Sequence, residues 1–238
     1  SLREVSPLRI QPLLLAHLNL ARNDIGAEGA GSVAGALGQC PASWGDNDFD
    51  PYMCGDDLIL PGFVDGHVHY AQIGVIASFG AQLLDWLEKY TFPEEARFSD
   101  LNYARETASL FLDLLLANGT TTAAVYCTVH PESADAFFEE AASRNLRMIA
   151  GKILMDRNAP DTVTDTAQSG YDDSRSLIEK WHGRGRNLYA VTPRFAPTST
   201  PAQLEVCGQL MSEFGDVYLQ THVSENLDEI KWVSDLFP

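Results

Sequence analysis

The sequence has few basic residues. Its 16 lysines and arginines stand against 33 aspartates and glutamates, which gives a formal net charge of −17. Proteins that bind nucleic acid or anionic membrane surfaces cluster Lys and Arg where the phosphates lie. The acidic balance therefore argues against both kinds of partner.

Long apolar runs and paired cysteines are also missing. No apolar stretch approaches the roughly 18 residues that cross a bilayer, and the N-terminus has no basic region followed by an uninterrupted apolar segment. The four cysteines form no C-x-x-C pair, which argues against a zinc knuckle or a redox motif of that type. With 45% hydrophobic residues in 238, the composition is that of a globular protein, and we expect a cytoplasmic one.

The stretch from Leu60 to His69 reads as a buried strand that ends in two histidines, His67 and His69. Alternate residues on a strand share one face, so both imidazoles would project together from its C-terminal end and could bind one metal ion. The alternative is two histidines on a half-exposed strand without a ligand, and the pair alone does not decide between these readings.

A second strand-like stretch, at 217–222, also ends in a histidine, His222, and Glu225 follows three residues later. A third imidazole adds a metal ligand, and a nearby carboxylate can take a proton from water and return it to a leaving group. The combination favours metal-assisted hydrolysis. For Glu225 alone, the alternative is a carboxylate placed at a helix start by the helix dipole.

The first 57 residues differ from the rest. Residues 15–26 match the L-x-x-L-x-L-x-x-N pattern of a leucine-rich repeat of the ribonuclease-inhibitor type, and residues 27–37 could form its helix. A single unit at 13–37 cannot bury its own core, because about three such repeats must stack. Residues 40–57 read as an irregular linker, so we expect two regions, 1–57 and 58–238.

Past Asp57, apolar strands alternate with helical segments, which is the pattern of a parallel α/β domain. We expect strands at 58–69, 120–126, 146–155, 187–195 and 217–222, and helices at about 100–117, 132–144, 174–182, 201–214 and 225–238. The apolar segment 82–90 contains Trp86, for which we expect core packing, with a place in a ligand pocket as the alternative. A closed (β/α)8 TIM barrel needs eight strands, so five βα units predict a truncated barrel.

Three motifs stand out: Pro-Gly-Phe-Val-Asp-Gly-His-Val-His at 61–69, Asn-Gly-Thr-Thr-Thr at 118–122, and Thr-His-Val-Ser-Glu at 221–225. Together they resemble the amidohydrolase superfamily of metal-dependent hydrolases. Segments 69–72, 84–93, 151–152 with 155–156, and 192–195 are similar to the guanine deaminase family within it. The resemblance covers residues 58–238 and implies an amidohydrolase-type TIM barrel.

The resemblance implies one zinc ion held by His67, His69 and His222, with Glu225 as the proton shuttle. It also implies that Gln72 and Arg194 hydrogen-bond a purine whose plane is held by Phe195. The implied reaction is the hydrolytic deamination of guanine to xanthine and ammonia in purine catabolism. The family pattern has a further histidine after strand six and an aspartate after strand eight, which would lie beyond Pro238, so we expect weak zinc binding and little turnover from this polypeptide alone.

Other readings stay open. Arg194 could be a structural ion-pairing residue, and Gln72 could be an amide that caps a loop. The barrel part could be inactive while the leucine-rich element binds a partner, or the enzyme could deaminate another heterocycle. A homo-oligomer is also open. We expect no ligand role for His130 or His182.

Overall fold

The computed structural model describes residues 61–78 and 82–238. The leucine-rich-repeat-like segment, the linker and the expected boundary at Asp57 lie outside the described residues. By their internal contacts, the described residues divide into a smaller unit, which includes 61–65 and Asp113–Thr122, and a larger unit, Gly66–Leu112 with Ala123–Pro238. Every residue of the candidate site lies in the larger unit.

Six strands of the described residues form one sheet, with the order β1, β2, β3, β5, β4 and with β6 paired to β5. Their bounds are β1 Phe63–His69, β2 Thr120–Tyr126, β3 Arg147–Gly151, β4 Ile153–Leu154, β5 Leu188–Pro193 and β6 Tyr218–Leu219. Strands β3, β4 and β6 all pair with β5 in parallel. The sheet confirms the predicted parallel α/β class.

Strands β3 and β4 are two parts of the single strand expected at 146–155. Ile149 pairs with Leu188 and Ile153 pairs with Thr192, so both parts keep one register against β5. The interruption falls at Lys152, beside Gly151, where an added Cβ would come within 1.8 Å of the Ala190 carbonyl oxygen. Only glycine allows the two backbones to approach this closely.

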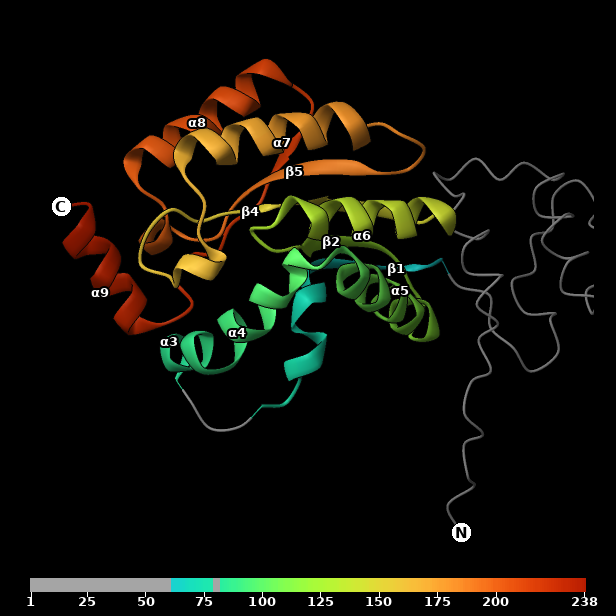
Figure 1. Cartoon of the computed structure of the whole chain (residues 1–238), viewed down its shortest axis with the longest axis horizontal. Helices are drawn as coiled ribbons and strands as arrows, with labels where there is room; N and C mark the ends of the chain where they lie inside the picture. The colour runs from blue at the N-terminus through green and yellow to red at the C-terminus, as the bar shows by residue number, and fades with distance from the viewer. Residues whose placement is uncertain (1–60, 79–81) are drawn as a thin grey trace, which may run out of the picture. The chain divides into compact units, whose positions relative to one another are not determined.

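Helices cover the connections between strands, as expected for βα units. The bounds are α3 Leu83–Trp86, α4 Phe92–Glu95, α5 Leu101–Ala117, α6 Pro131–Ser143, α7 Ala167–Trp181, α8 Pro201–Glu213 and α9 Leu227–Leu236. In Figure 1, α7 and α8 lie side by side next to β5. Among the described residues, no helix is long and apolar enough to span a bilayer.

Two expected elements differ from the structure. The helix expected at 174–182 begins earlier, at Ala167, because Thr166 and Ser169 form a reciprocal capping box at its N-terminus. The strand expected at 217–222 is reduced to Tyr218–Leu219 and is followed by a single bridge between Phe195 and His222. That bridge brings His222 next to the end of β5.

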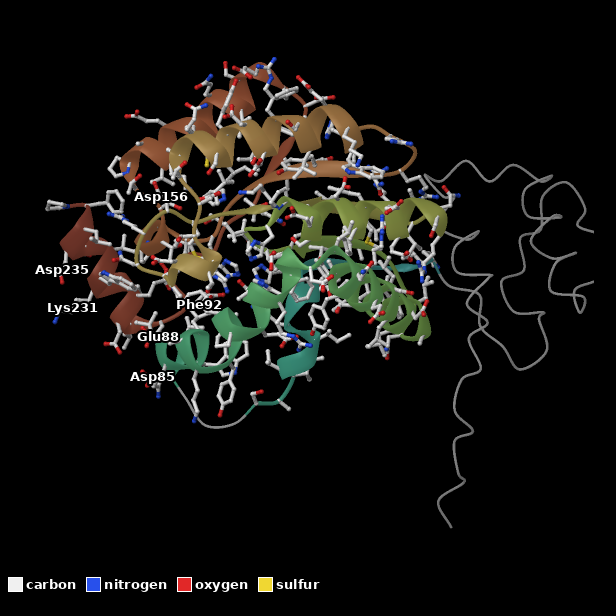
Figure 2. All side chains as sticks on the ribbon, in the orientation of Figure 1. Asp85, Glu88, Phe92, Asp156, Lys231 and Asp235 are labelled. Atoms are coloured by element: carbon white, nitrogen blue, oxygen red, sulfur yellow. The ribbon has the colours of Figure 1, made fainter. Side chains whose placement is uncertain are left out.

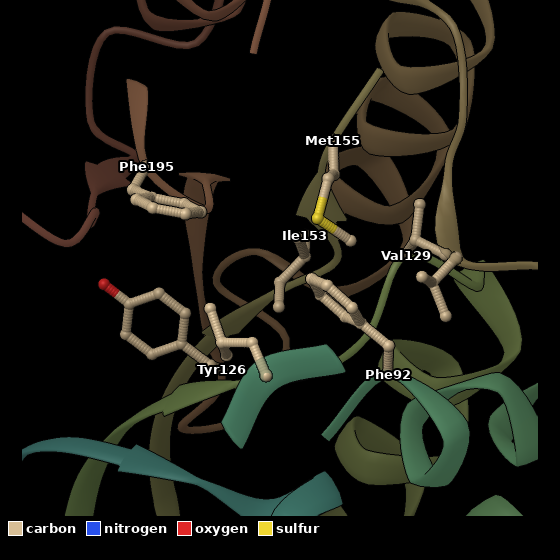
Figure 3. Packing of buried hydrophobic residues seen from close by; sticks show 8 residues of the cluster. Phe92, Tyr126, Val129, Ile153, Met155 and Phe195 are labelled. Atoms are coloured by element: carbon tan, nitrogen blue, oxygen red, sulfur yellow. The ribbon is translucent and has the colours of Figure 1, made fainter. Parts of the chain in front are cut away.

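A buried hydrophobic cluster lies beneath the site. It consists of Leu87, Phe92, Tyr126, Val129, Ile153, Met155, Val163 and Phe195. Figure 3 shows Phe92 of α4 on one side of Ile153, and Tyr126 and Phe195 on the other. In α9, the charged Lys231 and Asp235 point outward (Figure 2), whereas Trp232 packs edge-on to the Phe195 ring. The amphipathic α9 thus closes one end of the cluster.

Candidate metal centre and adjoining pocket

Three imidazoles meet at the C-terminal ends of the strands. His67 and His69 project from the end of β1, and His222 follows β6. One ring nitrogen from each lies within 4.8 Å of the others, and the Nε2 atoms of His69 and His222 are 2.9 Å apart. The structure therefore brings the three sequence-predicted ligands into one group that could hold a metal ion.

The orientation of His222 is set by Arg194. The Arg194 carbonyl oxygen accepts the His222 backbone N–H at 3.0 Å and its Nδ1–H at 2.8 Å. With the proton held on Nδ1, the lone pair of a neutral imidazole is on Nε2, the atom that faces His69. This arrangement prepares His222 for a metal ion.

Burial keeps two of the imidazoles neutral. Desolvation, with smaller contributions from Arg194 and the neighbouring histidines, holds the pKa of His69 well below its ordinary value. Desolvation also lowers the pKa of His222 to about 4, partly opposed by its hydrogen bond to the Arg194 carbonyl. Neutral imidazoles are the form that binds metal, so the donor set suits zinc.

Tyr126 forms the apolar floor of the three histidines. Its ring stacks on His69 with centroids 4.5 Å apart and lies 4.8 Å from His67 and 4.4 Å from His222. Burial, followed by the charge of Glu225, raises the pKa of Tyr126. The sequence analysis placed this residue in a strand and missed its position below the site.

A pocket opens beside the histidines. The other residues lining it are Gln72, Leu83, Trp86, Leu87, Arg194, Phe195 and Glu225. All the predicted substrate-binding residues therefore lie around one cavity with the predicted ligands. Trp86 has both of the roles considered for it, because it packs against the hydrophobic cluster and lines the pocket. The leucines of the pocket wall had not been singled out from the sequence.

Arg194 lies in an ion pair, the alternative role considered for it, with a partner that the sequence did not predict. Its Nη1 donates to Oε2 of Glu95 at 2.6 Å, and both side chains are almost completely buried. The Gln72 amide nitrogen lies 3.1 Å from Nδ1 of His69 and 3.5 Å from Oε1 of Glu95. A Phe-Pro-Glu-Glu sequence at a helix start reads as solvent-exposed, so only the buried partners identify Glu95.

Glu225 stands on a short turn between His222 and α9. Ser224 in this turn has a positive φ of 59°, a conformation that is uncommon for serine. The buried Glu229 carboxylate accepts the backbone N–H groups of Ser224 at 3.0 Å and Glu225 at 2.7 Å. Glu229, another residue that the sequence analysis missed, therefore holds the turn while the Glu225 side chain remains at the pocket.

The two histidines set aside from the sequence lie outside the group of three. His182 accepts the Tyr189 backbone N–H on Nδ1 at 2.9 Å, a structural hydrogen bond beside β5. His130 immediately precedes α6 and is not among the pocket residues.

The sequence of this chain matches a family of known proteins. Residues 58–238 match the model of the Amidohydrolase family. Guanine deaminase from Escherichia coli (strain K12) is 57% identical over 181 residues, which are 76% of this chain and 41% of that protein. A probable guanine deaminase from Deinococcus radiodurans is 46% identical over the same shares.

The solved structures give the same picture. The E. coli guanine deaminase structure matches with a TM-score of 0.74 over 75% of this chain and 41% of that one. The structure from C. acetobutylicum, with guanine bound in its active site, is 33% identical and matches with a TM-score of 0.71 over 80% and 47%. The chain thus spans about two fifths of the length of the curated relatives it matches. It belongs to the Amidohydrolase family.

Proposed function

We propose that this chain contributes the zinc-binding and purine-binding part of a guanine deaminase, which hydrolyses guanine to xanthine and ammonia. One observation carries the proposal: a single pocket joins three imidazoles, a carboxylate, an amide and a guanidinium. The guanine deaminase relatives support the substrate. A cytoplasmic location and a homo-oligomer stay predictions from the sequence.

The donor set supports zinc as the metal. His67, His69 and His222 would hold it, since three imidazoles are a common protein ligand set for catalytic zinc. Bound there, zinc would supply a Lewis acid that makes water reactive near neutral pH. The apolar floor of Tyr126 and the hydrogen bond from His222 to Arg194 keep the imidazoles in place.

The purine would lie between the polar and apolar walls of the pocket. Arg194 and Gln72 present nitrogen donors to the edge of a planar base, and the Gln72 amide also offers an acceptor. Phe195 and Trp86 offer flat surfaces for its faces, while Leu83 and Leu87 exclude water. Such a wall favours a flat heteroaromatic ring over a flexible substrate.

Glu225 would move the protons. It lines the same pocket as the imidazoles, where it can accept a proton from the attacking water and deliver it to the departing amino group. The Glu229 carboxylate accepts the Glu225 backbone N–H, which fixes the backbone from which the Glu225 side chain reaches the pocket. The products are xanthine and ammonia.

The test combines binding and turnover by the zinc-loaded chain. Guanine binding is expected to quench Trp86 fluorescence, and slow ammonia release should require both zinc and guanine. Glu225→Gln should lower the rate of ammonia release about 100-fold or more, while guanine still binds. His182→Gln, a matched control outside the pocket, should change neither. Zinc-loaded, folded chain that binds no guanine but deaminates a different heterocycle would contradict the substrate assignment.

A further inference from the structure

We infer that Glu95 is a positioning residue that fixes Arg194 and Gln72 in the geometry needed to recognise the purine. The inference rests on the proposed function, because it concerns the same pocket. Glu95 itself does not line the pocket and is completely buried. It would therefore act through its neighbours and would not touch the substrate.

The two carboxylate oxygens of Glu95 face Arg194 and Gln72, the two side chains proposed to hydrogen-bond the purine. Oε2 accepts from Arg194 Nη1 at 2.6 Å, a short charge-assisted hydrogen bond, and Oε1 lies 3.5 Å from the Gln72 amide nitrogen. Carboxylate oxygens only accept, so Glu95 draws an N–H of each side chain toward itself. One carboxylate thus sets the direction of both groups.

The helix that carries Glu95 provides a second support for Arg194. Phe92 and Glu95 lie three residues apart on α4, on the same face. The guanidinium carbon of Arg194 is 5.4 Å from the centre of the Phe92 ring, within the range of a cation–π contact. The guanidinium is therefore held between a ring and a carboxylate from one helical turn.

The backbone around Glu95 departs from a regular α-helix. A π-helical turn, Leu87–Thr91, joins α3 to α4 and shifts the helical register by one residue. Pro93 follows directly as the second residue of α4. Such π turns are frequent at functional sites, and this one lies between Trp86, which lines the pocket, and the helical turn that carries Glu95.

The held residues are also tied to the histidines. The Arg194 carbonyl oxygen binds His222, and the Gln72 amide lies 3.1 Å from His69 Nδ1. Glu95 thus belongs to one hydrogen-bond network with Arg194, Gln72 and the imidazoles of His69 and His222. Disturbing Glu95 should therefore change how well guanine is recognised.

The neighbouring Glu94 is a matched control. It is also buried and ion-paired, but its partners are Arg97 at 2.9 Å and the Tyr103 hydroxyl, none of which lines the pocket. Glu94→Gln and Glu95→Gln remove the same charge from the same helical turn. Only the second touches Arg194 and Gln72.

The experiment compares these variants in the full chain. The first readout is the side-chain NMR spectrum of 15N-labelled arginine, without substrate. We expect ordered, slowly exchanging guanidinium signals for Arg194 in wild type and Glu94→Gln, and their loss in Glu95→Gln. Retention of the ordered signals in Glu95→Gln would overturn the inference.

The second readout is guanine affinity of the zinc-loaded chain. Glu95→Gln should weaken guanine binding roughly 30-fold or more, the usual scale for breaking a buried charged hydrogen bond. In an Arg194→Met background the same change should weaken it less than about 3-fold, because coupled residues are not additive. Equal effects in both backgrounds would overturn the inference. If wild type binds no guanine, the proposed function fails, and the arginine spectrum still decides the role of Glu95.

Discussion

Two buried ion pairs in this chain resemble each other in burial and differ in surroundings. Lys152 Nζ lies 2.5 Å from Asp165 Oδ2, and Arg194 Nη1 lies 2.6 Å from Glu95 Oε2. Asp165 also accepts the Met155 backbone N–H and the Gln203 amide, so its partners come from several elements of the interior. Arg194, by contrast, lines the pocket.

The difference separates a structural pair from a functional one. Buried ion pairs seldom add net stability over an apolar replacement, yet removal of one partner is costly. The Lys152–Asp165 pair connects the interrupted strand to neighbouring segments and is not among the residues that line the pocket. The Arg194–Glu95 pair keeps a charged donor at the pocket, where we propose that it takes part in binding the purine.

The largest effect on stability is expected from Asp165→Leu. The change leaves Lys152 buried without its partner and removes the acceptor of the Met155 N–H and the Gln203 amide. We expect the free energy of unfolding to fall by about 3–5 kcal/mol, measured by urea denaturation. A loss below about 1 kcal/mol would show that the pair is not the structural anchor described above.

A simultaneous change of both partners tests the other pair. Arg194→Met with Glu95→Gln leaves no unpaired charge, so the free energy of unfolding should fall by less than about 2 kcal/mol. Guanine affinity of the zinc-loaded chain should nevertheless drop about 100-fold, or about 2.7 kcal/mol. Titration of guanine followed by denaturation of the same samples gives both numbers. Unchanged affinity would make this pair structural like the first.

Acid should destabilise the metal-free chain through the pocket region. The folded-state pKa values of His69 and His222 lie below the ordinary value of 6.5, that of His222 at about 4. Between these pH values the unfolded chain binds more protons, so stability falls as pH decreases from about 6.5 toward 4, by at most ~1.4 kcal/mol per pH unit for each histidine. His222→Gln should reduce this slope. Denaturation at several pH values measures it.

The smallest effect is expected at the apolar wall. Trp86→Leu removes a flat surface from the pocket and should weaken guanine binding about 5-fold, or ~1 kcal/mol, because a leucine cannot stack on a planar ring. Trp181→Phe is the control, since Trp181 stacks on Phe138 and donates to Asp135, and none of the three lines the pocket. Equal losses in both variants would mean that general packing is responsible.

Much of this fold could be predicted because its signals are local. Each expected strand overlaps an observed one. His67 and His69 lie at the C-terminal end of β1 and His222 follows β6, at the edge where a parallel sheet places its functional groups. The early start of α7 was missed because its cap, Thr166 with Ser169, lies in a polar stretch without apolar periodicity.

The supporting residues could not be predicted, because their roles depend on partners far along the chain. Glu95 is 99 positions from Arg194, and its own neighbourhood is that of an exposed helix start. Glu229 looks like an ordinary first-turn acid of α9, yet it is buried and holds the Glu225 turn. Sequence patterns identify functional side chains at the ends of strands. The residues that orient those side chains, such as Glu95 and Glu229, can be identified only from their contacts in the folded chain.

Zinc content of the purified chain tests the central claim most directly. We expect up to one zinc ion per chain, bound weakly enough to be stripped by a chelator, and we expect its loss in His222→Ala but not in His182→Gln. The His182 variant controls for the removal of an imidazole from elsewhere. Well-folded wild-type chain that takes up no zinc, or a His222→Ala variant that takes up as much as wild type, would contradict the account.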